Sequence, residues 1–211
     1  MTNPDNGPRQ GGPYRPPVLR PGPDSAPRGR GLPCGTCTPP RNPRPSVRPS
    51  PDEFRAALSQ LASGVALVTA NDPEDGEDAG MTATSFLSVS LEPPLVLISV
   101  REDSRMDDVL TRAETWAVSL LAEEQRTAAS RFAMKGQLSD RLLFADTPHR
   151  RGEHSGAPLI EGALATVECR TEQRVTAGDH VLVIGRVLEA RVQQPGAKPL
   201  LYFRGDYRKL A

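Results

Sequence analysis

Two long runs of residues with strand-like alternation lie near the C-terminal end of the sequence, and a tight turn joins them. The runs cover residues 163–175 and 180–192, and the link Thr176-Ala177-Gly178-Asp179 places a glycine where such a turn needs a positive φ. Strands joined by so short a link pair antiparallel, because a parallel pair needs a crossover of about a dozen residues or more. This hairpin therefore predicts an antiparallel sheet.

The sequence before and after this hairpin shows the same kind of pattern. Strands are predicted over 65–70, 80–90, 95–100, 115–121 and 200–203, and the almost wholly apolar run 95–100 predicts burial on both faces. About six strands, with mostly hairpin-length links and no regular alternation with helices, predict a mainly β fold, an antiparallel barrel. Neither G-x-G-x-x-G nor G-x-x-x-x-G-K-[ST] occurs, so a Rossmann sheet is not expected and any nucleotide is bound by another route.

Few helices are predicted. Ser50 and Glu53 have the spacing of a capping box, and the apolar residues Phe54, Leu58 and Leu61 then predict a short amphipathic helix that ends near residue 64. Ser104 is a candidate cap for a second helix, and residues 123–134 predict a third. Residues 135–157 predict a long loop with one helical turn around 142–144.

The first 49 residues differ sharply in composition from the rest. Of 22 prolines, fifteen fall between Pro4 and Pro51, together with eight arginines and only two aspartates, so this segment has a net charge of about +6 in a neutral chain. A stretch with so few sizeable apolar side chains cannot bury enough surface to offset chain entropy, which predicts a disordered tail over 1–49 and a folded domain over 50–211. Scattered arginines without interleaved aromatic residues favour a solvated tail over a nucleic-acid site.

The cysteines and the hydropathy pattern indicate a cytoplasmic protein. No stretch approaches the roughly 18 to 20 apolar residues that span a bilayer, and the N-terminus lacks the apolar core of a signal peptide. Cys34 and Cys37 form a lone C-G-T-C, and no second Cys or His pair follows at a suitable spacing, so no metal site is expected. Cys169 lies in an apolar alternation and is interpreted as core packing.

Several short segments, in order, carry a resemblance to a known family. They are Gly80-Met81-Thr82-Ala83-Thr84-Ser85-Phe86, Ser88-Val89-Ser90, Glu92-Pro93-Pro94-Leu95-Val96, Ser99-Val100-Arg101 with Ser104, Gly178-Asp179-His180 with Gly185 and Val187, and residues 201–207. Together they span nearly all of residues 52–211, and the chain resembles the flavin reductases with the FMN-binding split-barrel fold. The resemblance implies an antiparallel split β-barrel with a few short helices. This chain departs from the pattern at Met106, where many family members carry a small polar residue or threonine.

The resemblance assigns most of these segments to flavin binding. Small hydroxylated residues let the backbone approach a flavin ring, so that main-chain N–H groups and hydroxyls can donate to it, and a loop that enters a helix N-terminus can accept a phosphate. The ordinary alternatives are a Thr/Ser-rich strand, a helix cap and a solvated C-terminus. The candidate flavin-binding residues are Met81, Thr82, Ala83, Thr84, Ser85, Ser99, Val100, Arg101, Ser104, Tyr207 and Arg208.

The resemblance also implies a reaction and partners. His180 is the candidate catalytic residue, as the position that helps to place the nicotinamide or protonate the reduced flavin; a structural histidine is the alternative. Hydride passes from C4 of NADH or NADPH to N5 of FMN or FAD, which needs no nucleophile, metal or carboxylate pair. A homodimer with flavin near the subunit interface is expected, together with a separate flavin-dependent monooxygenase that receives the reduced flavin.

Two other functions fit the same sequence features. One is a pyridoxamine-phosphate oxidase-like split-barrel enzyme, which would hold FMN tightly and oxidise its substrate with oxygen. The other is a non-enzymatic protein that binds or senses flavin. Oxidation of NADH only when free flavin is added separates a flavin reductase from both.

Overall fold

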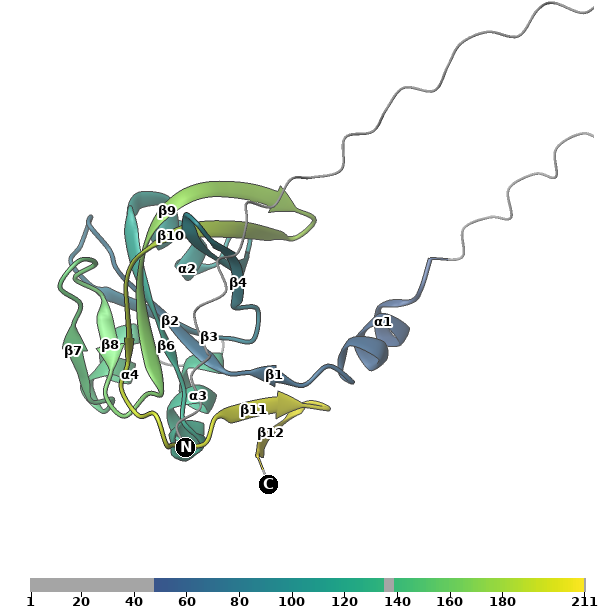
Figure 1. Cartoon of the computed structure of the whole chain (residues 1–211). Coiled ribbons are helices and arrows are strands. Elements are labelled where there is room, and N and C mark those ends of the chain that lie inside the picture. The colour runs from purple at the N-terminus through teal and green to yellow at the C-terminus, as the bar shows by residue number, and fades with distance from the viewer. Residues whose placement is uncertain (1–47, 135–138, 211) are drawn as a thin grey trace, which may run out of the picture. The chain divides into compact units, whose positions relative to one another are not determined.

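The computed structural model describes residues 48–134 and 139–210, and these form a mainly β domain (Figure 1). The predicted tail lies outside the described residues, except for Arg48 and Pro49, and so do Cys34 and Cys37. The strands are β1 (Ser63–Gly64), β2 (Ala66–Asn71), β3 (Asp78–Ala83), β4 (Leu87–Leu91), β5 (Pro94–Arg101), β6 (Thr115–Leu120), β7 (His149–Arg151), β8 (Pro158–Ile160), β9 (Ala165–Ala177), β10 (His180–Val192), β11 (Leu200–Phe203) and β12 (Asp206–Lys209). The helices are α1 (Pro51–Leu58), α2 (Arg105–Arg112), the 3-10 turn η1 (Glu123–Gln125), α3 (Arg126–Ala133) and α4 (Asp140–Ala145).

One sheet of seven strands forms the body of the domain, in the order β3-β2-β6-β9-β10-β5-β4, and every neighbouring pair is antiparallel. The predicted hairpin is its longest unit. β10 begins and ends where the sequence predicted, and Gly178 in the turn has φ +69°. The prediction of a mainly β, antiparallel fold with a few short helices is confirmed.

The sheet curls because its two outer strands are joined by a very short connection. β3 and β4 stand at opposite ends of the strand order, yet only residues 84–86 link them. Strands about 4.8 Å apart would place the outer strands of a flat seven-stranded sheet roughly 29 Å from each other. A link of three residues reaches only about 14 Å. The sheet therefore bends until its edges approach, and β3 and β4 are not paired with each other, so the barrel is split.

The interior of this curled sheet holds the main core. Ile98, Val100, Val68 and Val183 are fully buried there with Trp116, whose indole N–H donates to Thr171 Oγ1 at 3.1 Å. Position 185 requires glycine because of this indole ring: a Cβ built on Gly185 would lie 2.4 Å from Trp116 Cζ2. A second core cluster lies under α3 and α4, where the rings of Phe132 and Phe144 meet with centroids 4.9 Å apart.

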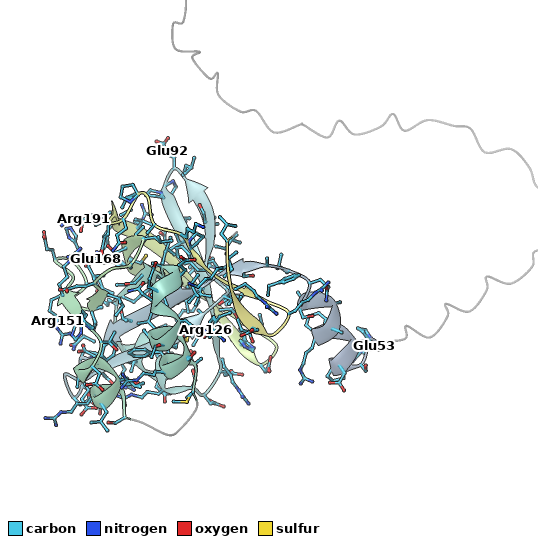
Figure 2. All side chains as sticks on the ribbon, turned by 90° about the horizontal axis from the view of Figure 1, so that it is seen from below. Glu53, Glu92, Arg126, Arg151, Glu168 and Arg191 are labelled. Carbon is cyan, nitrogen blue, oxygen red and sulfur yellow. The ribbon has the colours of Figure 1, made fainter. Side chains whose placement is uncertain are left out.

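The first helix differs from its prediction. The Ser50–Glu53 capping box is present, but α1 ends at Leu58 and buries none of its residues. Phe54 and Leu58 are 57% and 50% exposed. Figures 1 and 2 show that α1 projects away from the seven-stranded sheet, in agreement with its lack of buried residues.

Three strand predictions need correction. Residues 80–90 form two strands, β3 and β4, because the chain leaves one edge of the sheet at Thr84 and joins the other edge at Leu87. β5 buries one face only, through Val96, Ile98 and Val100, while its other face is partly exposed. β7 lies in the segment 135–157 that was predicted as a loop, and it pairs with β8 directly after that segment; α4 lies at the predicted helical turn.

A small sheet closes the C-terminal end of the domain. Its order is β1-β11-β12, so the short strand after α1 pairs with the last hairpin of the chain. β11 has the predicted bounds, whereas β12 was not predicted as a strand. The turn between them is made by Arg204 and Gly205, both with positive φ.

Candidate active site

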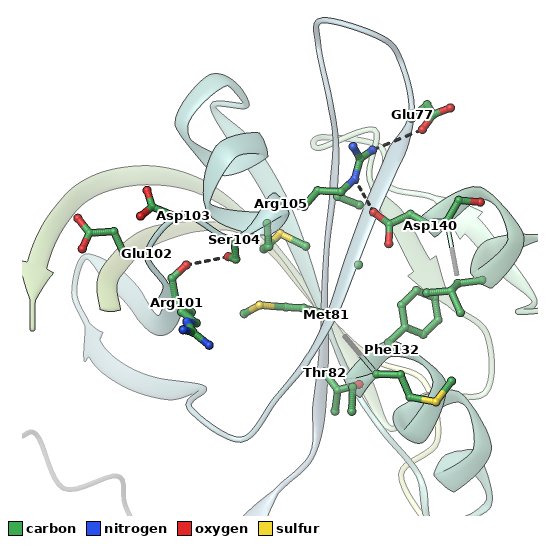
Figure 3. Close-up of a pocket in the computed structure, with 17 residues that line it drawn as sticks. Glu77, Met81, Thr82, Arg101, Glu102, Asp103, Ser104, Arg105, Phe132 and Asp140 are labelled. Atoms are coloured by element: carbon green, nitrogen blue, oxygen red, sulfur yellow. Dashed lines mark hydrogen bonds and ion pairs between the residues drawn. The ribbon is translucent and has the colours of Figure 1, made fainter. Parts of the chain in front are cut away.

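A cleft of about 790 Å3 lies between the edge strand β3, the connection from β5 to α2, and the facing ends of α3 and α4 (Figure 3). β3 pairs only with β2, so the backbone groups on its outer side are not used by the sheet. The cleft is thus bordered by an edge that offers main-chain donors and acceptors. Its described lining residues are Glu77, Ala79, Gly80, Met81, Thr82, Arg101, Glu102, Asp103, Ser104, Arg105, Met106, Phe132, Ala133, Met134, Ser139, Asp140 and Leu143.

Four of the predicted flavin-binding residues meet in this cleft, namely Met81, Thr82, Arg101 and Ser104. Ser104 caps α2, since its hydroxyl accepts from the Asp107 N–H at 3.3 Å and donates to the Arg101 carbonyl at 2.7 Å. These bonds fix the turn after β5. Arg101 forms no ion pair with any described residue, so its guanidinium is free to bind an anion.

Two hydroxyls of the Thr/Ser segment at the end of β3 form hydrogen bonds within the fold. Thr82 Oγ1 donates to the Ala129 carbonyl of α3 at 2.7 Å, and Ser85 Oγ bonds both the N–H and the carbonyl of Ser99 on β5. These bonds hold α3 and β5 to the connection between the sheet edges. A ligand in the cleft would therefore meet the backbone of this segment more than its hydroxyl protons.

Other predicted residues lie outside the main cleft. Ala83 and Val100 are buried in the core, so only their backbone is available to a ligand. Thr84 and Ser85 line a separate apolar groove of about 490 Å3. Ser99 lines neither the main cleft nor this groove.

The two candidates near the C-terminus, Tyr207 and Arg208, lie in different surroundings. Tyr207 lines a third cleft of about 490 Å3 together with Tyr202, Thr84 and Thr82, and Thr82 also borders the main cleft. The rings of Tyr202 and Tyr207 meet edge to face with centroids 5.5 Å apart. Burial raises the pKa of Tyr207, so its hydroxyl stays protonated. Arg208 is exposed and lines none of the described clefts.

His180 stands beside the cleft rather than in its wall. In the sheet register it lies opposite Arg101, and the Glu102 N–H donates to the Asp179 carbonyl at 3.1 Å, so the turn of the long hairpin touches the cleft loop. His180 Nδ1 lies 2.8 Å from Asp179 Oδ1, and its side chain is 43% exposed. The His180 hydrogen bond lowers the pKa of Asp179, with a smaller effect of Arg101. Nδ1 donating to this carboxylate leaves Nε2 for a ligand.

Three ionised residues in the cleft wall, Arg105, Glu77 and Asp140, were not predicted from the sequence. Arg105 Nε lies 2.7 Å from Asp140 Oδ2, and Arg105 Nη2 lies 3.4 Å from Glu77 Oε2. The position of Arg105, directly after the cap Ser104, could have suggested it. Glu77 lies in the loop before β3 and Asp140 begins α4; neither position carries a local signal of a shared site, and only the fold brings them together.

The described residues contain neither a metal-binding cluster nor a membrane-spanning helix. No group of three or more His, Cys, Asp or Glu side chains is arranged for a metal ion there. No helix over 48–134 or 139–210 is long and apolar enough to cross a membrane. Burial raises the pKa of the Cys169 thiol to about 12, so this thiol is unreactive, in agreement with its interpretation as core packing.

An antiparallel split barrel with a cleft at its open edge defines a class of small β-barrel proteins, and comparison with known proteins specifies the family. The model of the flavin reductase like domain matches residues 58–211. The chain belongs to the flavin reductase family, as the sequence segments predicted.

Similar proteins extend over most of the chain. An NADH:riboflavin 5'-phosphate oxidoreductase of Streptomyces pristinaespiralis is 40% identical over 78% of this chain and 89% of its own. The reductase component of the 4-hydroxyphenylacetate 3-monooxygenase of Thermus thermophilus is 38% identical over 75% of this chain and 96% of its own. The solved NADH:FAD oxidoreductase of Streptomyces globisporus, in complex with NAD and FAD fragments, is 39% identical with a TM-score of 0.70, covering 76% of this chain and 92% of that one.

Proposed function

We propose that this flavin reductase transfers a hydride from NADH or NADPH to FMN or FAD and supplies the reduced flavin to a separate flavin-dependent monooxygenase. The observation that carries the proposal is the cleft in which Met81 and Thr82 of the edge strand face the Arg101–Ser104 turn. The named activities of the relatives support it, as does the reductase component from Thermus thermophilus, which serves a monooxygenase.

The residues of the cleft fit a flavin nucleotide. A volume of about 790 Å3 lies within the usual range of roughly 300–1,000 Å3 for small-molecule sites. Met81, Met106 and Phe132 supply an apolar wall for a ring system, and the unpaired edge of β3 supplies main-chain groups for its polar rim. The free guanidinium of Arg101 supplies the cation that a phosphate needs.

The chain's own residues have to bind and orient two ligands. A bound flavin supplies the two-electron acceptor, and the nicotinamide supplies the hydride. The backbone of Met81–Ser85 orients the ring edge, and Arg101 with the Ser104 cap binds the phosphate side of the ligand. Asp179 holds the His180 ring through Nδ1, so that Nε2 can donate to, or deliver a proton at, the open side of the cleft.

Turnover assays test this proposal directly. The purified chain should oxidise NADH or NADPH rapidly when FMN or FAD is added and only slowly without added flavin. Each pairing of the two nicotinamides with the two flavins is measured at steady state. Absence of flavin-dependent oxidation with all four pairings would contradict the enzymatic proposal, and tight copurification of FMN with oxygen consumption on another substrate would favour the oxidase alternative.

A homodimer forms part of the proposal, and an exposed apolar surface supports it. Leu87 and Leu91 of β4 are 59% and 90% exposed, and Leu61 after α1 is 64% exposed. Leu61 and Leu87 line the apolar groove that Thr84 and Ser85 border. A second copy seated on this surface would cover the leucines and bring the subunit interface next to the flavin segment.

The oligomeric state tests the dimer. Leu87→Asp places a charge in the groove and should convert the dimer to a monomer in sedimentation velocity. Val192→Asp is the matched control, because Val192 is 72% exposed and lines none of the described clefts. A monomeric wild type, or a dimer unaffected by Leu87→Asp, would refute this interface.

The use of a nicotinamide reductant supports a cytoplasmic location, which fractionation of cells can test.

A further inference from the structure

Two arginines border the phosphate side of the cleft, and they differ in their ion pairs. Arg101 forms no ion pair with a described residue, whereas Arg105 is bound to both Asp140 and Glu77, at 2.7 and 3.4 Å. Figure 3 shows the Arg105 side chain directed away from Arg101, toward the two carboxylates on the far side of the cleft. The three ion-pair partners come from three separate elements: α2, the start of α4 and the loop before β3.

Asp140 and Glu77 keep Arg105 in its ion pairs because the partly buried charge of Asp140 requires a neighbouring cation. The Asp140 side chain is only 13% exposed, and burial raises its pKa, an effect that Arg105 opposes and that Glu77 and Asp78 increase. If Arg105 turned to another anion, Asp140 would remain partly buried among negative charges without its cation. Leaving a partly buried charge unpaired is costly, so Arg105 stays with Asp140.

The charges of the cleft add to this effect. Its described lining contains four carboxylates, Glu77, Glu102, Asp103 and Asp140, against the two guanidiniums. A phosphate monoester carries a charge of about −1.5 to −2 near neutral pH. Such a group therefore meets one free cation in a cleft whose lining has a net negative charge.

We propose that Asp140 and Glu77 are specificity-determining residues, which withhold Arg105 from the flavin phosphate and keep phosphorylated flavin weakly bound. This inference rests on the proposed function, and it explains how a flavin reductase can release its product. A second charge-assisted contact to the phosphate would slow the departure of the flavin after reduction. The cleft keeps the second arginine occupied and so binds the phosphate with Arg101 alone.

The test compares two flavins that differ only by the phosphate. Dissociation constants for FMN and riboflavin are measured by quenching of flavin fluorescence with the full chain. Asp140→Asn weakens the hold on Arg105 and should tighten FMN about fivefold, the order of one charge-assisted hydrogen bond partly screened by solvent, with riboflavin changed less than twofold. Asp146→Asn is the matched control: it removes the same charge at the other end of α4, where Asp146 pairs with Arg131, and Arg131 does not line the cleft.

A second variant identifies Arg105 as the source of the gain. In Asp140→Asn/Arg105→Met, FMN affinity should return to within twofold of the wild type. Equal tightening of riboflavin, no change for FMN, or a gain that persists without Arg105 would each overturn the inference. Thermal midpoints confirm that each variant folds. Failure of the proposed function is distinguishable, because a wild type that binds neither flavin contradicts that function before any variant is compared.

Discussion

Glu168 offers a sharp test of how a charged group stabilises the interior of this domain. It lies on β9 with a relative exposure of 1%, and the turn between β7 and β8 wraps around its carboxylate. Oε2 accepts from the Ser155 N–H and hydroxyl at 2.7 Å each and from the His154 N–H at 3.0 Å, and Oε1 accepts from the Glu153 N–H at 3.2 Å. Burial alone would raise the pKa of Glu168, but these hydrogen bonds outweigh it and lower the pKa.

The variant Glu168→Gln preserves size and removes the charge. An amide oxygen in place of Oε2 keeps three of the bonds in neutral form, each weaker by roughly 1 kcal/mol, and the amide nitrogen then faces the Glu153 N–H, donor to donor. Relief from burying a charge offsets part of this loss. A net destabilisation of about 2 kcal/mol follows, which corresponds to a fall in Tm of roughly 4–8 °C for a domain of this size.

The pH dependence has a definite sign. A carboxyl whose pKa is lower in the folded state stabilises the fold above its unfolded pKa, near 4.5, and loses that contribution as the pH falls through its folded pKa. The difference in Tm between wild type and Glu168→Gln should therefore be full at pH 7 and shrink below about pH 4. Differential scanning calorimetry at both pH values measures it, with the exposed Glu161→Gln as control. A variant that melts with the wild type at pH 7, or a difference that is as large at pH 3.5, would refute the reasoning.

Three further outcomes are expected. His180→Ala should slow hydride transfer by roughly 10- to 1000-fold in stopped flow and change flavin affinity by less than about tenfold, since the ring stands beside the cleft; an unchanged transfer rate with weakened flavin binding would make it a flavin-binding residue. Deletion of residues 1–49 should leave Tm and turnover nearly unchanged, and a loss of several degrees would show that the tail packs on the domain. Gly185→Ala should lower stability by about 1–3 kcal/mol in urea unfolding, because the added Cβ meets the buried Trp116 ring; a stability equal to wild type would contradict that packing.

Local patterns in the sequence were enough to predict much of the sheet. The long hairpin was predictable because a 13-residue alternation ends at a glycine that the turn requires, and β10 has the predicted bounds. The division of 80–90 into β3 and β4 was not, because residues 84–86 contain neither glycine nor proline and the strand-like pattern continues through them. What separates the two strands is their place at opposite edges of the sheet, which is a property of the whole fold.

Part of the candidate site could be proposed from the sequence. Met81, Thr82, Arg101 and Ser104 were predicted from family-like segments, and the fold brings them into one cleft. The carboxylates of Glu77 and Asp140 had no such signal, because each lies in a segment without periodicity. Their place in the cleft follows only from their ion pairs with Arg105, which the fold creates. The exposure of α1 was also unpredictable, since an amphipathic pattern shows that a helix has an apolar side but not what covers it.

The three-residue connection between β3 and β4 makes chain length at that point a determinant of how far apart the two sheet edges lie. One inserted residue adds about 3.5 Å of reach and allows the two sheet edges to move apart, without changing any side chain of the core. Residues added to the loop before β3 would have no such effect, because that loop joins two strands that are already paired. Chain length at 84–86 therefore controls the width of the split between the two sheet edges.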